Sequence, residues 1–182
     1  PGWVTDEEIL YIGTGSSNIP IGGVGAPFIN ANTYTTLQAA ITAIPSGSVL
    51  VIPSGTYVYS GLWTIDKPCT ILAYGATLSF ATDANNQGVR VTSSDVHIKG
   101  LKVTGPQHAT LDNTQRGIYA YGPSYAAPIE NVTVEDCNIS NFGGAGIHAM
   151  YVKNYKAIRN LVYDIFYEGI GAEAILDFII DG

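Results

Sequence analysis

The chain has 182 residues, of which 46% are hydrophobic and only 13% charged, with 21 glycines, 12 tyrosines and 9 prolines. A net charge of −7 with only 8 Lys and Arg excludes a surface that binds nucleic acid, because phosphate recognition needs clustered basic side chains. No apolar run approaches the roughly 20 residues of a membrane helix, so we expect no membrane insertion. Cys69 and Cys137 lack metal-binding spacing, and we predict neither a metal nor another cofactor.

Residues 1–34 read as an extended, Gly-rich N-terminal segment. Its stretches "GTGSSN" and "GGVG" lack the strand–loop–helix context of a phosphate-binding loop, so they are interpreted as turns or a linker. The opening "PGWVTDEEIL" has no basic region of the kind that begins a signal peptide.

One short helix is predicted in "TYTTLQAAITAIPSG". Leu37, Ala40, Ile41 and Ile44 recur at helical spacing, Thr35 or Thr36 is a plausible N-cap, and the Pro-Ser-Gly of 45–47 ends the helix. A helix at this place would cover the exposed end of a stack of strands that begins directly after it.

Two apolar patterns then recur to the end of the chain. The first, apolar-x-apolar-x-x-small or apolar-x-apolar, begins at Leu50, Ile71, Val96, Val132, Tyr155 and Phe178. The second, Gly-apolar-x-small, begins at Gly61, Gly88, Gly117, Gly146 and Gly169. One copy is too short to bury its apolar face, so neighbouring copies must stack, and the alternation within each copy is typical of strands. We therefore predict an all-β parallel β-helix, a solenoid, over residues 35–182.

Strand alternation assigns the sides of the second pattern. It predicts two outward columns whose members lie about 4.8 Å apart. The columns are Trp63, Arg90, Tyr119, His148 and Gly171, and beside them Ile65, Thr92, Tyr121, Met150 and Glu173.

This mixture of side chains suits carbohydrate. Aromatic faces pack against sugar rings, and Arg90 can pair with the carboxylate of a uronate or sialate. The candidate carbohydrate-binding residues are Trp63, Arg90, Tyr119, Tyr121, His148 and Glu173. Two alternatives stay open for this face: a contact with another chain of an oligomer, or an inert exposed surface.

No catalytic residue is assigned from the sequence. A glycoside hydrolase needs two carboxyl groups about 5 to 10 Å apart, and only Glu173 lies on the columns, because Glu135 and Asp136 fall on the other strand set. A polysaccharide lyase would need a base, either His148 or Tyr119, together with Arg90 to neutralise the sugar carboxylate. We expect Cys137 to be a buried thiol and Asn160, one coil later in the same slot, to be a structural corner residue whose amide bonds to backbone.

The stretches "TLQAAITAI", "VLVIPSGTYVYSGLWTI" and "ILAYGATLSF" resemble the start of the pectate-lyase-like right-handed parallel β-helix superfamily. Many of its members have an Asp-rich stretch before the helix, where "INANTYT" stands here. The segment "TDEEILYIGTGSSNIPIGG" resembles repeats of bacteriophage tail fibres and tailspikes. The resemblance implies a right-handed solenoid in a homotrimer on the virion, outside the cell, with residues 1–34 attached to other tail or baseplate proteins.

The leading hypothesis is a phage tailspike or tail fibre that recognises host surface polysaccharide. One alternative is a polysaccharide depolymerase, a lyase or hydrolase with its site partly downstream of residue 182, and another is a purely structural spike stem. Because the last copy stops in mid-pattern at Asp181-Gly182, we also expect the β-helix to continue in a longer protein.

Overall fold

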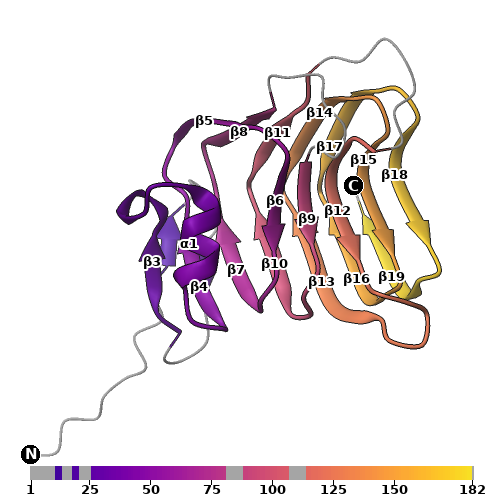
Figure 1. Cartoon of the computed structure of the whole chain (residues 1–182), viewed down its shortest axis with the longest axis horizontal. Coiled ribbons are helices and arrows are strands. Elements are labelled where there is room, and N and C mark those ends of the chain that lie inside the picture. Colours follow the sequence, from indigo (N-terminus) through magenta and orange to yellow (C-terminus); the bar gives the residue numbers. More distant parts are fainter. Residues whose placement is uncertain (1–10, 14–17, 21–25, 81–87, 107–113, 182) are drawn as a thin grey trace, which may run out of the picture.

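A computed structural model describes residues 11–13, 18–20, 26–80, 88–106 and 114–181. The chain winds into a solenoid of stacked coils whose strands form three parallel sheets (Figure 1). The predicted all-β parallel β-helix is therefore confirmed. Among the described residues, no helix has the length and apolar character needed to span a membrane.

Sheet 1 runs the length of the solenoid in the order β19-β16-β13-β10-β7-β4-β3. Its strands are β3 (Phe28–Asn30), β4 (Ser48–Val51), β7 (Cys69–Leu72), β10 (Val96–Lys99), β13 (Ile129–Glu135), β16 (Val152–Ile158) and β19 (Leu176–Asp181). Each successive strand belongs to the next coil, so residues one coil apart in sequence lie side by side.

Sheets 2 and 3 complete each coil with five strands apiece. Sheet 2 contains β5 (Gly55–Tyr59), β8 (Ala76–Phe80), β11 (Lys102–Thr104), β14 (Asn138–Phe142) and β17 (Leu161–Ile165). Sheet 3 contains β6 (Leu62–Ile65), β9 (Gly88–Val91), β12 (Arg116–Tyr121), β15 (Ala145–Met150) and β18 (Glu168–Glu173).

The N-terminal part holds an antiparallel pair, β1 (Tyr11–Gly13) with β2 (Asn18–Pro20), then the 3-10 helix η1 (Ala31–Thr33) and the α-helix α1 (Leu37–Ala43). Of the two stretches predicted as turns or a linker, 13–18 and 22–25, Gly13 and Asn18 lie in the paired strands β1 and β2. Residues 14–17 and 22–25 lie outside the described residues, as does most of the predicted attachment segment.

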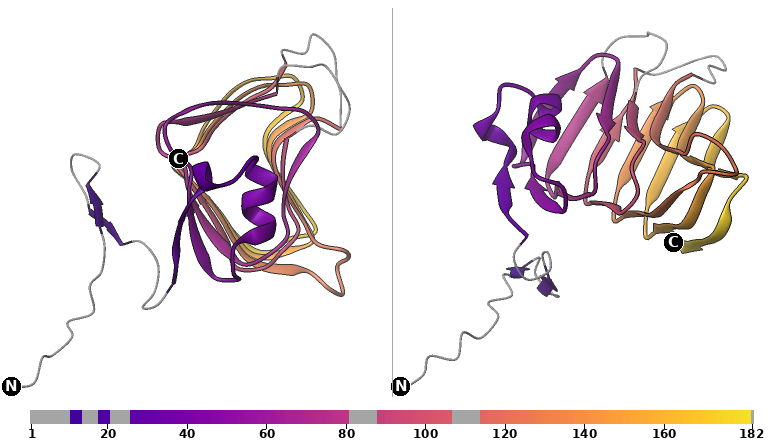
Figure 2. Two further views of the ribbon diagram at one scale, coloured as in Figure 1. Left: turned by 60° about the vertical axis from the view of Figure 1, so that its left-hand side comes forward. Right: turned by 60° about the horizontal axis from the view of Figure 1, so that its bottom comes forward.

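Helix α1 lies across the first coil and closes that end of the solenoid (Figure 2). Of the two proposed N-caps, Thr36 is the one used: its hydroxyl accepts a hydrogen bond from Ala39 N–H at 3.0 Å. The Gln38 side chain accepts a bond from Thr64 N–H at 2.9 Å and donates one to Thr64 C=O at 3.1 Å. These two bonds satisfy backbone groups at the free edge of β6, as a neighbouring strand would.

Corners of the solenoid are made by residues in the left-handed backbone region. Asp95, Asn131, Asn154 and Asp177 occupy equivalent places in sheet 1, each directly before the first residue of the recurring apolar pattern, with φ between 55° and 60°. Asn and Asp tolerate this conformation better than other non-Gly residues. Their side chains also bond from coil to coil: Asn131 donates to Asp95 at 2.8 Å and Asn154 donates to Asn131 at 3.0 Å.

The predicted alignment of the first pattern is correct from Val96 onward, where Val132, Tyr155 and Phe178 lie in the same row of sheet 1. In the first two coils it is shifted. Ile71 lies opposite Ile98, whereas the sequence pattern aligned Ile71 with Val96. The reason is a wider corner: Ala76 comes five positions after Ile71, while Leu101 comes three positions after Ile98. Because this shift is of two residues, it leaves the inward and outward sides unchanged.

The core is a continuous stack of inward side chains along the solenoid, and it is less well covered at its last coil. In β19, Phe178 and Ile180 are 57% and 47% exposed, because no later coil of the described residues lies on them.

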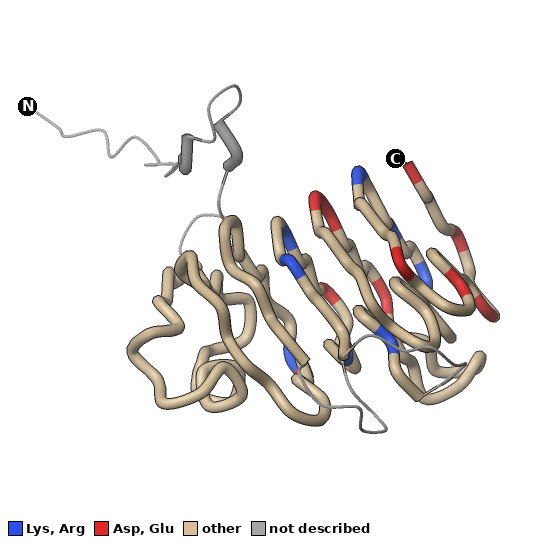
Figure 3. Tube along the Cα trace, turned by 90° about the horizontal axis from the view of Figure 1, so that it is seen from above, with Lys and Arg blue, Asp and Glu red and all other residues tan. Residues whose placement is uncertain are grey.

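Charged residues are distributed unevenly along the solenoid (Figure 3). Residues 26–65, which include α1 and the first coil, contain no Asp, Glu, Lys or Arg, and all eight Lys and Arg lie from Lys67 onward. Any surface that uses charge must therefore lie on the later coils.

Candidate carbohydrate-binding face

The outward side chains of sheet 3 form the candidate site, called below the sheet 3 face. The strand register stacks Arg90, Tyr119, His148 and Gly171 in one column, as predicted. Tyr121, Met150 and Glu173 form the second predicted column beside it.

The prediction that Trp63 and Ile65 face outward is wrong. Trp63 lies opposite Val89, and both Trp63 and Ile65 are fully buried in the core. The sequence pattern aligned Gly61 with Gly88, but Leu62 is the residue opposite Gly88. A slip of one residue moves a strand's side chains to the other face, so Thr64 occupies the place in the column that was assigned to Trp63.

Two arginines on this face lie over tyrosine rings. The Arg116 guanidinium carbon lies 4.3 Å from the ring centroid of Tyr119, and that of Arg90 lies 5.4 Å from the ring centroid of Tyr121. The two tyrosine rings are 5.4 Å apart. Burial raises the pKa of Tyr119, and the positive charges of Arg116 and Arg90 partly offset that rise. The four side chains therefore form one compact cationic and aromatic cluster.

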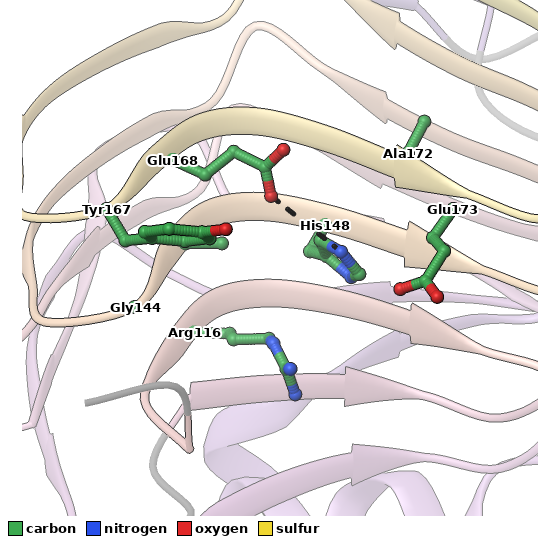
Figure 4. A pocket seen from close by; sticks show the side chains of 8 residues that line it. Arg116, Gly144, His148, Tyr167, Glu168, Ala172 and Glu173 are labelled. Carbon is green, nitrogen blue, oxygen red and sulfur yellow. Dashed lines mark ion pairs between the residues drawn. The ribbon is translucent and has the colours of Figure 1, made fainter. Parts of the chain in front are cut away.

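His148 lies at the bottom of a hollow of about 340 Å³, whose lining includes Arg116, Tyr167, Glu168 and Glu173. Its side chain points outward as predicted, but neighbours cover it so well that the residue is only 8% exposed. The Tyr119 ring is 5.4 Å away, which confirms the expected pairing of these two residues. Figure 4 shows Glu168 and Glu173 on either side of His148, with Arg116 on a neighbouring strand.

The His148 ring is suited to the neutral state. Burial lowers its pKa and Arg116 lowers it further, while Glu168 and Glu173 act in the opposite direction. Its Nε2 is 3.8 Å from Oε2 of Glu168, and its Nδ1 is buried without a hydrogen-bond partner among the described residues. A neutral imidazole of this kind can accept a proton or a hydrogen bond from a hydroxyl group in the hollow.

Gly171 allows Glu168 to reach His148. A Cβ atom at Gly171 would fall on the carboxylate of Glu168, which lies directly over this glycine. Since Gly171 is the residue opposite His148 in the register, the missing side chain leaves the space through which Glu168 approaches the imidazole.

Sequence reasoning missed Arg116 and Glu168. Both stand one residue before the glycine of the second pattern, at Gly117 and Gly169, and Ala145 takes the same place between them. The patterns were read only from the glycine onward. The residue before each glycine could have been included in the pattern, because it is the first residue of its strand.

The outer face of sheet 1, by contrast, has a closed network of ion pairs. Glu135 accepts from His97 Nε2 at 2.7 Å and from Lys99 Nζ at 3.0 Å, and it also pairs with Arg159. Arg159 in turn bonds to Asp136 with its Nε at 2.8 Å. Burial acts to raise the pKa of Glu135, but the hydrogen bonds from Lys99, Arg159 and His97 together lower it. Glu135 and Asp136 thus lie away from the sheet 3 face, as expected.

The two structural predictions inside the solenoid are confirmed. Cys137 is a buried free thiol. The Asn160 side chain accepts from Cys137 N–H and donates to Val134 C=O, each at 2.9 Å, which holds the corner between β16 and β17. In the part of the chain that the structure describes, no three His, Cys, Asp or Glu side chains come together as a possible metal site.

Comparison with known proteins gives one match. The family model for the right-handed β-helix region matches residues 69–181. No curated protein and no solved structure is significantly similar to the chain. The family match covers the coils that contain most of sheet 3, and it agrees with the stacked parallel sheets described above. Because it spans more than half of the chain, the protein belongs to the right-handed β-helix family.

Proposed function

We propose that this protein is a homotrimeric tailspike or tail-fibre protein of a bacteriophage virion, which binds host surface polysaccharide outside the cell through the sheet 3 face. The main supporting observation is the cluster of Tyr119 and Tyr121 with Arg90 and Arg116 on adjacent strands. Right-handed β-helices commonly belong to proteins that bind or degrade polysaccharides, which agrees with this assignment.

The chemistry of the face supports sugar binding in particular. Tyrosine rings offer apolar surface to the C–H groups of a sugar, with a hydroxyl at the edge for hydrogen bonding. Successive members of each column repeat at the coil spacing of about 4.8 Å, so an extended polymer can contact several coils at once. His148 and Glu168 add hydrogen-bonding groups at the next two coils.

The virion attachment and the trimer rest on the sequence resemblance of residues 5–23 to tail-fibre and tailspike repeats. In this proposal the N-terminal segment joins other tail or baseplate proteins, and the β-helix points toward the host. Native mass spectrometry of the purified chain tests the trimer, and a monomer at micromolar concentration would contradict the tailspike assignment.

Binding is tested with a panel of purified bacterial capsular and O-antigen polysaccharides on a biosensor surface. For a polysaccharide that binds, Tyr119→Ala and Tyr121→Ala should each weaken the affinity about tenfold, because each removes one stacking surface. Tyr163→Ala is the matched control, since Tyr163 is an exposed tyrosine on β17 of sheet 2. An equal loss of affinity in all three variants would contradict binding at the sheet 3 face. If no polysaccharide binds, the remaining hypothesis is that the protein is a purely structural spike stem.

The hollow around His148 favours polysaccharide cleavage as a second candidate function. Glu168 and Glu173 place two carboxyl groups in the pocket that contains His148, and a glycoside hydrolase uses such a pair. Incubation with the bound polysaccharide, followed by a reducing-end assay and ultraviolet absorbance for unsaturated sugars, separates hydrolase, lyase and pure binder. Loss of cleavage in both Glu168→Gln and Glu173→Gln is expected for the hydrolase.

A further inference from the structure

A second hollow on the sheet 3 face adjoins the one around His148. It has a volume of about 370 Å³, and Arg116 lines both. Its other lining side chains include Leu62, Arg90, Tyr119, Tyr121 and Met150. Among the described residues that line it, two are cationic and none is acidic, whereas the hollow around His148 contains Glu168 and Glu173.

Stacking on the tyrosines presents the arginines in a particular way. A guanidinium over an aromatic ring uses its flat face for the contact and leaves the N–H groups at its edge for hydrogen bonds in the guanidinium plane. The guanidinium carbon of Arg116 lies 4.3 Å from the Tyr119 ring centroid, and that of Arg90 lies 5.4 Å from the Tyr121 ring centroid. Because the rings fix the side chains before a ligand arrives, less conformational entropy is lost on binding.

The hydrogen bonding of Arg90 is incomplete. Its Nε is buried and has no partner among the described residues. Arg90 also lines the hollow, so a ligand there can accept hydrogen bonds from its guanidinium group. Arg159 on the outer face of sheet 1 shows the opposite situation, because Asp136 and Glu135 already occupy its donors.

From these observations we propose that the hollow between Arg90 and Arg116 binds an acidic sugar unit of the polysaccharide, with the sugar carboxylate paired to the two guanidinium groups and the ring on Tyr119 and Tyr121. The inference rests on the proposed function and narrows its ligand class. A carboxylate matches the planar fork of a guanidinium in bidentate geometry, and both hexuronates and sialates supply it.

The neighbouring hollow restricts the rest of the ligand. Glu168 and Glu173 would repel a second carboxylate there, while their oxygens accept hydrogen bonds from sugar hydroxyls. The net charge of −7 also opposes binding of a uniformly acidic polymer. The ligand is therefore a heteropolysaccharide in which an acidic unit in the Arg90–Arg116 hollow is followed by a neutral unit beside His148.

The first experiment uses the full chain and single sugars. Nitrogen-15 NMR of the arginine Nε–H groups is recorded during titration with glucuronate, with N-acetylneuraminate and with glucose. The Arg90 and Arg116 signals should shift with at least one of the two acids and stay unchanged with glucose, and the acid that shifts them tells hexuronate from sialate. Unchanged signals with both acids, or equal shifts with glucose, would overturn the proposal.

Matched charge variants locate the effect. Arg90→Gln and Arg116→Gln should weaken binding of the active acid roughly tenfold to a hundredfold, the loss expected for a hydrogen bond to a charged group. Lys102→Gln removes one positive charge from an exposed residue of sheet 2 and should leave binding unchanged. Amide spectra of each variant show whether the solenoid is intact, so that loss of binding is not mistaken for loss of fold.

The second experiment compares each polysaccharide that binds with the same polymer after chemical reduction of its carboxyl groups. Reduction should weaken binding at least tenfold. Unchanged affinity of the reduced polymer, or binding of neutral polysaccharides alone, would overturn the acidic subsite but leave the proposed function standing. Absence of binding to the entire panel would instead contradict the proposed function, and the single-sugar titration would then decide the subsite separately.

Discussion

The outer faces of sheet 1 and sheet 3 use charge in opposite ways. On sheet 1, Glu135 is surrounded by His97, Lys99 and Arg159, and these side chains satisfy one another. On sheet 3, Arg90 and Arg116 are supported by tyrosine rings, and polar atoms such as His148 Nδ1 lack partners among the described residues. Ion pairs therefore stabilise the solenoid on one face, while in our proposal the other face binds a ligand.

The strongest test of this comparison is removal of the central carboxylate of sheet 1. Glu135→Ala leaves Lys99, whose side chain is only 11% exposed, without its partner, and breaking a buried ion pair costs about 3 kcal/mol. Urea denaturation should show this loss in the free energy of unfolding, while polysaccharide binding at sheet 3 stays unchanged in native buffer. Glu130→Ala, which breaks an exposed pair with Lys153, is the control and should cost less than about 1 kcal/mol.

A smaller effect is expected at Gly171. In Gly171→Ala the new methyl group occupies the place of the Glu168 carboxylate, so Glu168 must move away from His148 at a cost of about 1 kcal/mol. Because the negative charge of Glu168 acts to raise the pKa of His148, that pKa should fall further, as measured by NMR titration of the imidazole. Gly169→Ala on the same strand is the control, since its Cβ would make only ordinary contact with Val162. An unchanged His148 pKa in Gly171→Ala would show that Glu168 has no influence on the site.

The smallest effect concerns pH. The pKa of His148 in the folded protein is lowered below 6.5, so the folded state binds fewer protons than the unfolded state just below that pH. The stabilisation is present above pH 6.5 and is lost as the pH falls through the folded pKa. His148→Gln should therefore flatten the decline of unfolding free energy between pH 7 and pH 5, by at most about 1.4 kcal/mol per pH unit.

His97 provides the comparison on sheet 1. Burial is the main cause of its lowered pKa, and its hydrogen bond to Glu135 partly opposes that shift. His97→Gln should also flatten the decline, but it additionally removes a partner of Glu135 and so should lower stability at pH 7. A steeper pH dependence in His148→Gln than in the unmodified protein would contradict the assignment of a neutral imidazole.

Sequence reasoning predicted the solenoid, the helix that closes it and most of the outward column, because these depend on local alternation that survives loops of varying length. The predicted alignment of Tyr119 with His148 and Gly171 was correct because the glycines that precede them in the pattern lie in the same register. The error at Trp63 arose where Gly61 belongs to a turn with φ of 81° instead of to the strand. Alternation alone does not reveal where a strand begins, and one residue decides its side.

The two hollows could not be predicted from the columns of outward residues. Arg116 lies over Tyr119, three residues further along its own strand, and Glu168 reaches His148 from the adjacent strand over the missing side chain of Gly171. Such contacts depend on side-chain direction and on empty space beside the strand. Neither quantity is encoded in a repeat pattern, so the clustering of these residues became visible only in three dimensions.

Gln38 has a consequence for association between molecules. Its amide occupies both backbone groups of Thr64, which are the ones that an extended segment from another chain would use to add a strand beside β6. Sheet 3 therefore has a fixed beginning, and it can be extended only from its β18 side. The Gln38 side chain of the seven-residue helix α1 thus protects β6 from the edge-to-edge pairing that leads to aggregation.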